Sequence, residues 1–227
     1  MRRILVSILV LLASTRLCFA GEPVTPGNPA PAIDAMLQKS PETTGVFSAR
    51  PDGSALHIQS GFVCPASFPN VNLWQVQVFS AAKGQGTDVG CDYGRVRSGT
   101  TNQVEAKFTI FIVKAQQGMT LDEVFAGYLR EMRTTLPPQK MLGKALELTD
   151  NSTSKLPEIR SQTDQLTLGG RTYNNEIIVG VANGWAIELR ATYPIDFAPG
   201  DPATGIDLPA SAVIWVTTVG RFIKGDK

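Results

Sequence analysis

Apolar and polar residues alternate along three stretches in the first half of the chain, which is the pattern of a β-strand with one buried face. The first stretch follows the sequence RPDGS (50–54). Its proline presets φ, its aspartate bonds the backbone and its glycine accepts a positive φ, so we expect a hairpin turn. His57 and Gln59 lie on the less apolar side of this strand, where we expect His57 to face solvent or to be incidentally hydrogen-bonded. The apolar face gathers Leu56, Ile58, Phe62 and Cys64.

The second and third stretches predict longer strands. In LWQVQVFS (73–80), alternation places Gln75 and Gln77 on one face and Trp74, Val76 and Val78 on the other. In QVEAKFTIFIV (103–113), every second residue from Val104 to Ile112 is apolar. Phe111 and Val113 then make the end of this strand apolar on both sides, which favours burial.

Residues 120–136 have the clearest helical pattern. Thr120 and Glu123 are spaced as a capping box, and Pro137 and Pro138 end the run. The apolar positions recur at helical spacing, and we interpret them as core packing rather than a ligand site: Leu121, Val124, Phe125, Tyr128, Leu129 and Met132.

Residues 165–194 predict three strands joined by two tight turns, Gly169-Gly170 and Asn183-Gly184. A two-residue turn at 183–184 pairs Ala182 with Trp185, Ile178 with Leu189, and Ile177 with Arg190. Glu188 and Arg190, two residues apart on one strand, are interpreted as a surface ion pair. They share a face with Val179 and Val181, and the opposite face gathers Ile178, Ala182, Trp185, Ile187, Leu189 and Tyr193.

Two segments are less regular. Residues 139–164 are mixed and polar, and we expect at most short structure there. Residues 210–224 combine β-branching with a helical stripe, and we favour a closing helix over a strand. The fold class expected is α+β: an antiparallel β-sheet with one central amphipathic helix and a C-terminal helix packed on it, formed as a single domain by residues 44–227.

The N-terminus has the pattern of a secretory signal peptide, residues 1–20. Arg2 and Arg3 precede an apolar run that is too short to span a bilayer comfortably, and Ala20 fits the cleavage site. The mature chain is then expected to begin at Gly21, without a transmembrane segment, in the periplasm or outside the cell. Residues 21–43 read as a proline-rich leader, with one or two helical turns at 32–40.

Cleavage also changes the charge. It removes Arg2, Arg3 and Arg16 from the 21 basic residues and leaves 18 against 20 acidic ones, a net charge of −2. A nearly neutral exported chain has no electrostatic case for binding nucleic acid or anionic lipid. Its 43% of hydrophobic residues is enough for a core, which argues against a disordered chain.

The cysteines left after cleavage are Cys64 and Cys91, and three interpretations of them compete. Metal ligation lacks CxxC spacing and has His57 alone as a further ligand, and a catalytic thiolate would also need that histidine. An even number of cysteines in an oxidising compartment favours a disulfide, which we predict between Cys64 and Cys91.

This disulfide constrains the chain between residues 65 and 72. In a simple hairpin Cys91 would lie nearer the far end of the Trp74 strand from Cys64, roughly 20 Å away, whereas a disulfide needs Cα atoms within about 7 Å. The segment PASFPNVN (65–72) is therefore expected to make a wide excursion that carries the Trp74 strand away from its predecessor.

No motif in the sequence predicts a catalytic, cofactor-binding or metal site. There is no GxSxG, HExxH, GxxxxGK[ST] or strand-linked GxGxxG sequence, and one histidine gives little support to a catalytic triad. Asp88 and Asp92, which flank Cys91, are interpreted as turn and edge residues. A pair of carboxylates distant in the sequence stays open as a catalytic device.

The order of elements resembles that of PsbP/Mog1-like domains, in which helices sandwich an antiparallel sheet. The passages that carry the resemblance are FTIFIVKAQQGMTLDEVFAGYL (108–129), GGRTYNNEIIV (169–179), GWAIELRATYP (184–194) and VGRFIK (219–224). The wide 65–72 segment departs from that pattern. The resemblance implies a binding or assembly module without chemistry of its own, and it assigns no functional residue.

Three functions follow as hypotheses. The first is a non-catalytic binding or assembly module of the bacterial cell envelope, whose partner is an envelope protein or a small apolar ligand. The second is an envelope hydrolase of unrecognised type that uses carboxylates. The third is a structural subunit tethered by its leader, residues 21–32.

Overall fold

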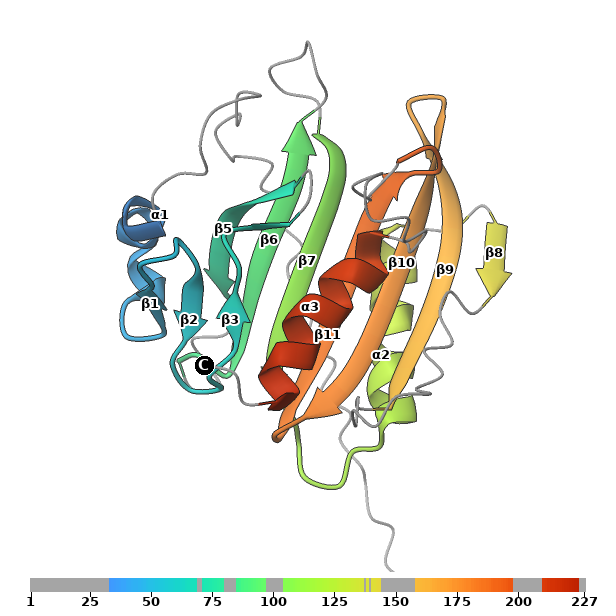
Figure 1. The fold of residues 1–227 in the computed structure, drawn as a ribbon. Coiled ribbons are helices and arrows are strands. Elements are labelled where there is room, and N and C mark those ends of the chain that lie inside the picture. The colour runs from blue at the N-terminus through green and yellow to red at the C-terminus, as the bar shows by residue number, and fades with distance from the viewer. Residues whose placement is uncertain are drawn as a thin grey trace, which may run out of the picture.

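The chain folds around one large antiparallel sheet, seen in a computed structural model that describes residues 33–68, 71–79, 85–96, 104–136, 138, 140–143, 158–197 and 210–224 (Figure 1). Its strand order is β4-β5-β6-β7-β11-β10-β9-β8. These strands are β4 Ser67–Phe68, β5 Val71–Val78, β6 Asp88–Val96, β7 Val104–Lys114, β8 Lys140–Gly143, β9 Ile159–Leu168, β10 Arg171–Ala182 and β11 Trp185–Pro194. Residues 1–32, which comprise the expected signal peptide and the first part of the expected leader, lie outside the described residues.

A small second sheet lies beside the first half of the large one. It has the order β1-β2-β3, with β1 Phe47–Ala49, β2 Ala55–His57 and β3 Val63–Cys64. The predicted turn joins β1 to β2: the Ser54 amide donates to the Asp52 carboxylate at 3.0 Å, and Gly53 has φ 78°. Two short helices precede this sheet, α1 Ile33–Lys39 and the 3-10 helix η1 Pro41–Thr43.

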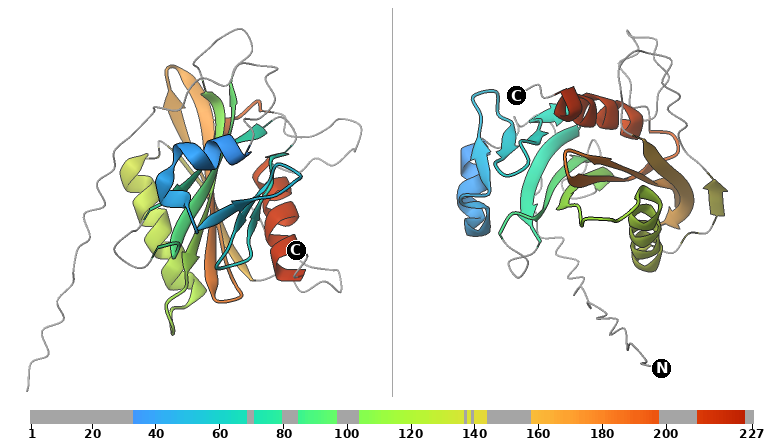
Figure 2. Two further views of the ribbon diagram at one scale, coloured as in Figure 1. Left: turned by 90° about the vertical axis from the view of Figure 1, so that its left-hand side faces the viewer. Right: turned by 90° about the horizontal axis from the view of Figure 1, so that it is seen from below.

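Helices cover the two faces of the large sheet unequally (Figure 2). Helix α2, Leu121–Thr135, packs on one face against β9 and β10. Helix α3, Ala210–Lys224, packs on the opposite face against β10 and β11, where the small sheet and α1 complete the cover. The α+β class and the packing of both helices on the sheet are thus as predicted. No helix among the described residues is long and apolar enough to cross a membrane.

Local sequence explains the two longest helices. Thr120 caps α2 in a complete capping box: its side chain accepts from the Glu123 amide at 3.2 Å, and its own amide donates to the Glu123 carboxylate at 2.9 Å. The predicted C-terminal helix is confirmed as α3. Its buried apolar side chains are Ala212, Ile214, Trp215, Val219 and Phe222, whereas Val216 is 38% exposed.

The hairpin of β10 and β11 has the register that the sequence predicted. Asn183, with φ 53°, and Gly184, with φ 76°, form the two-residue turn, because both tolerate the left-handed region. Ala182 pairs with Trp185 and Ile178 with Leu189.

The prediction for residues 139–164 was wrong. Strand β8 occupies Lys140–Gly143, and β9 starts at Ile159, six residues before the expected strand. Every second residue at its start is polar and lies on the face that α2 covers, namely Arg160, Gln162 and Asp164. Hydrophobic periodicity therefore did not reveal the strand. Asp164 is fully buried there because Arg133 of α2 pairs with it at 2.7 Å.

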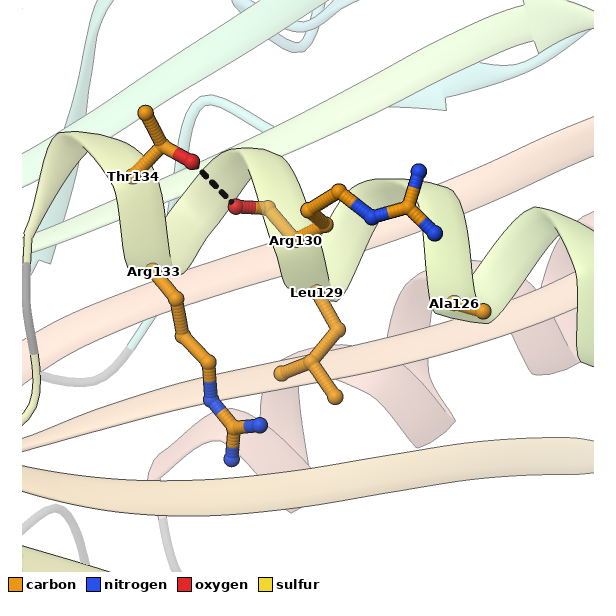
Figure 3. Close-up of a pocket in the computed structure, with 5 residues that line it drawn as sticks. All are labelled: Ala126, Leu129, Arg130, Arg133 and Thr134. Carbon is orange, nitrogen blue, oxygen red and sulfur yellow. Dashed lines mark hydrogen bonds between the residues drawn. The ribbon is translucent and has the colours of Figure 1, made fainter.

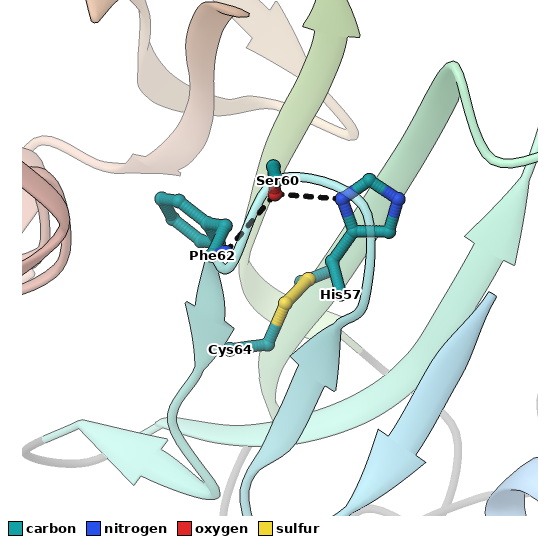
Figure 4. The surroundings of a disulfide bond; sticks show 5 residues. His57, Ser60, Phe62 and Cys64 are labelled. Carbon is teal, nitrogen blue, oxygen red and sulfur yellow. Dashed lines mark hydrogen bonds between the residues drawn. A yellow bond between two sulfur atoms is a disulfide. The ribbon is translucent and has the colours of Figure 1, made fainter. Parts of the chain in front are cut away.

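The predicted disulfide between Cys64 and Cys91 is present and joins the two sheets (Figure 4). Cys64 ends β3 of the small sheet, whereas Cys91 lies within β6 of the large one, and their Cα atoms are 6.2 Å apart. The predicted separation of the Trp74 strand from its predecessor is also confirmed, because β5 pairs with β4 and β6 in the large sheet and β3 pairs with β2. The expected wide loop is instead a short hairpin, in which Ser67 pairs with Asn72 and Phe68 with Val71. Both cysteines are fully buried, so the bond staples the core.

The expectation of a solvent-facing His57 was wrong. His57 is fully buried, whereas Ile58, assigned to the apolar face, is 50% exposed. The Gly86 carbonyl accepts a hydrogen bond from Nε2 at 2.9 Å, and the Ser60 hydroxyl bonds Nδ1 at 2.7 Å. The neutral imidazole thus ties the small sheet to the turn before β6, and Trp185 packs edge-on against it at 5.2 Å.

Loss of the disulfide is expected to destabilise the fold without changing it. The bond closes a separation of 27 residues, which corresponds to about 3.5 kcal/mol in the chain-entropy model. Urea unfolding of the Cys64→Ala/Cys91→Ala double variant should show this loss, and reduced wild-type protein should match it. An unchanged free energy of unfolding would contradict the assigned role.

The pKa of His57 should lie far below that of an exposed histidine. Burial lowers this pKa to about 4, although the Gly86 carbonyl opposes the shift. The His57 contribution to stability is therefore complete above pH 6.5 and is lost as the pH falls toward 4. His57 is the single histidine of the chain, so its NMR resonance in untagged protein can be assigned directly. Titration near pH 6.5 would show that the ring is accessible to water.

Candidate functional site

The candidate site is the part of the large sheet that lies beside α2. Helix α2 packs on β9 and β10, and on this same side β5, β6 and β7 carry aromatic and polar side chains. Figure 2 shows the helix on one side of this face, with β5–β7 extending away from it. We call this the outer face, defined by Trp74, Gln75, Gln77, Phe79, Gly90, Asp92, Gly94, Lys107, Thr109 and Phe111.

A β-bulge places Trp74 on the outer face. The pairing of β5 with β6 shifts between Leu73 and Gln75, so one extra residue is inserted and the alternation changes phase. Leu73 and Val76 point into the core, whereas the Trp74 ring lies over Gly94 of β6. The prediction that Trp74 shares a face with Val76 was therefore wrong, because alternation alone does not reveal a bulge.

The Trp74 ring packs directly on Gly94. A Cβ atom on Gly94 would lie 2.0 Å from Cζ2 and 2.1 Å from Cη2 of that ring, which real atoms do not allow. The indole therefore packs directly on the backbone of β6, and the ring is half-buried. A glycine inside a strand often marks such a close approach.

Phe79 repeats this arrangement at Gly90, four residues before Gly94 on β6. A Cβ on Gly90 would lie 2.7 Å from the Phe79 ring, which is 44% exposed. The Phe111 ring of β7 lies 5.4 Å from that of Phe79, and the Arg190 guanidinium lies over Phe111 at 4.8 Å from its centroid. Phe79, Phe111 and the Arg190 guanidinium are thus in successive contact, and Arg190 also reaches Glu131 of α2.

Asp92 lies between the two glycines and was wrongly interpreted as an edge residue. It occupies the middle of β6, paired with strands on both sides, and is 5% exposed. The Thr109 hydroxyl donates to one carboxylate oxygen at 2.5 Å and the Gln77 amide to the other, and Lys107 lies 3.6 Å away. Asp92 thereby fixes the polar side chains around it.

Glu188 and Arg190 form a buried ion pair, not the predicted surface pair. Glu188 is 1% exposed, with its carboxylate 2.5 Å from Nε of Arg190, which also reaches Glu131 of α2 at 3.2 Å. Burial raises the pKa of Glu188 to about 7, although the Arg190 charge opposes the shift. The prediction of a surface pair failed because α2 packs beside this part of β11, and Glu131 of α2 contacts Arg190.

Another buried acid lies on the opposite side of the sheet. Glu176 is 1% exposed, and the hydroxyls of Ser211 and Tyr193 donate to it, the second at 3.0 Å. Burial raises its pKa, and these hydrogen bonds oppose the rise. Glu176 therefore fixes the start of α3 on the sheet and is closed off from the outer face.

A shallow depression of about 420 Å³ lies along α2 (Figure 3). Arg133 points from it toward β9, where it holds Asp164, and the Thr134 hydroxyl donates to the Arg130 carbonyl at 2.8 Å. Arg133 is engaged by Asp164, and the depression is lined by one helix alone, so it is a weaker candidate than the outer face. Its lining residues are Ala126, Leu129, Arg130, Arg133 and Thr134.

The residues singled out from the sequence, Cys64 and Cys91, do not belong to the outer face. Cys64 and Cys91 form a disulfide, as predicted, and no described group of three His, Cys, Asp or Glu side chains could hold a metal ion. The sequence reading missed the roles of Trp74 and Phe79. The available signal was the spacing of Gly90 and Gly94 in a strand, four residues apart and therefore on one face.

Comparisons with known proteins supply no assignment. No family model matches the chain, and no curated protein matches it.

The seat of Trp74 can be tested by Gly94→Ala. The added methyl must displace the indole, so we expect a loss of about 1–3 kcal/mol in unfolding free energy together with stronger quenching of Trp emission by acrylamide. The other two tryptophans, Trp185 and Trp215, are 3% and 2% exposed and contribute little to that quenching.

Gly127→Ala is the matched control. No atom lies within 4 Å of a Cβ at this exposed position of α2, and alanine is the better helix former, so stability should rise by about 0.5–1 kcal/mol. Equal effects of the two substitutions would rule out a ring seated on Gly94.

Proposed function

We propose that this chain is an exported, non-catalytic binding module of the bacterial cell envelope and that the outer face is its binding surface. The observation that carries the proposal is the seating of Trp74 and Phe79 on Gly94 and Gly90. Because these two glycines inside the sheet have no side chains, aromatic rings can pack directly on the backbone of β6. Exposed aromatic groups beside fixed polar groups are typical of recognition surfaces.

Export is supported by two independent features. The first 20 residues have the pattern of a signal peptide, and the Cys64–Cys91 disulfide is of the kind that persists in oxidising compartments. The periplasm or the extracellular space is the location that fits both. The resemblance in element order to PsbP/Mog1-like domains also implies a binding or assembly role.

The burial and hydrogen bonding of the acidic side chains favour binding over catalysis. Glu188, Asp164 and Glu176 are each at most 1% exposed and hold structural hydrogen bonds. Asp92 is held by Thr109 and Gln77. A general acid or base must reach its substrate within hydrogen-bond distance, which these paired side chains do not offer in this conformation.

The alternative is an envelope hydrolase that uses carboxylates. One observation favours it: the pKa of Glu188, raised to about 7, is in the range suited to a general acid. In this alternative, Glu188 would have to leave Arg190 and reach the outer face.

Retention on isolated cell envelopes tests the proposal. We expect the mature protein to sediment with envelopes of its own organism, and Trp74→Ala and Phe79→Ala each to reduce the bound fraction at least tenfold, because each removes one ring of the surface. Met141→Ala, which changes a 65% exposed side chain on β8, is the control and should bind as wild type.

Two results would contradict the proposal. Failure of the wild type to sediment, or unchanged sedimentation of both aromatic variants, would remove the outer face as a binding surface. Turnover in an esterase, glycosidase and peptidase panel, abolished by Glu188→Gln, would establish the hydrolase instead.

A further inference from the structure

The outer face offers two separate rings rather than one apolar patch. Trp74 and Phe79 pack on Gly94 and Gly90, which are four residues apart on β6, so the two packing positions are about 13 Å apart along the strand. Phe111 extends the second position toward α2. Flat rings at two positions suit a ligand with repeated apolar surfaces, such as the C–H faces of sugar rings.

Polar side chains fill the space between these rings. Gln77 and Thr109 are oriented by Asp92, while Gln75 is exposed, and Lys107 is exposed on the same face. The amides of Gln75 and Gln77 supply donors and acceptors together, which matches the rim of hydroxyl groups around a sugar ring. A purely apolar ligand would cover the exposed Gln75 amide without offering it a hydrogen-bond partner.

The charged side chains on and beside the outer face are paired with one another. Lys107 pairs with Asp92, and Arg190 pairs with Glu188 and with Glu131. An anionic polymer or a basic peptide would have to compete with these pairs, whereas an uncharged ligand leaves them intact. The complementary ligand is therefore polar and neutral.

We propose that the outer face binds a neutral, chain-like glycan of the cell envelope, with sugar rings stacked on Trp74 and Phe79. The inference rests on the proposed function and names its ligand class. The side-chain amides of Gln75 and Gln77 hydrogen-bond the hydroxyl groups of the sugar between the two stacked rings. Because the two packing positions are about 13 Å apart along the strand, an oligosaccharide engages both rings and a monosaccharide only one.

The test is a titration of the full mature protein with neutral β-1,4-linked oligosaccharides, N-acetylchitotetraose and cellotetraose. At least one should give a saturable change in Trp emission and a measurable heat of binding. Its monosaccharide should bind at least tenfold more weakly. Trp74→Ala should abolish binding and Phe79→Ala should weaken it at least tenfold, with Met141→Ala unchanged.

Folding of each variant is checked by its urea midpoint, and the exposed Phe79 provides a substitution that the fold should tolerate if Trp74→Ala does not fold. Tetrasaccharide binding that survives Phe79→Ala would overturn the assigned site. Absence of binding to both tetrasaccharides, with envelope retention still dependent on Trp74 and Phe79, would overturn the glycan inference and leave the proposed function standing. Loss of retention as well would overturn both.

Discussion

The structure depends on what packs against the two faces of strand β6. On its inner face Cys91 is bonded to Cys64, which fixes the small sheet against the large one and closes the core. On its outer face Gly90 and Gly94 have no side chains, and the rings of Phe79 and Trp74 occupy the vacant surface. Because consecutive residues of a strand point to opposite faces, one strand serves both the core and the candidate site.

Several contacts order the side chains of the outer face. The disulfide and the buried His57 hold the inner side of the β5–β6 region, and Asp92 orders its outer side through Thr109 and Gln77. At the other end, Arg190 connects Phe111 to Glu131 of α2. Groups held in advance lose little entropy when a ligand binds, which is the advantage of such a surface for recognition.

Much of the fold was predictable from local signals. Thr120 and Glu123 specified the start of α2, and Asn183-Gly184 fixed the register of β10 and β11, because capping and turn chemistry act within a few residues. The features that failed depend on distant contacts. The bulge that turns Trp74 outward is a property of strand pairing, and His57 is buried by the turn at Gly86 and by Trp185, far along the chain. The polar start of β9 is buried by Arg133 of a helix, which no periodicity in β9 itself indicates.

The central claim is that the rings seated on β6 form the contact surface of this protein in the envelope. Hydroxyl-radical footprinting of the mature protein, free and bound to isolated envelopes, measures this directly, side chain by side chain. Protection of Trp74 and Phe79, with Met141 and Leu168 equally modified in both states, is the predicted result. Unchanged modification of Trp74 and Phe79 together with protection elsewhere would show that the protein uses a different surface.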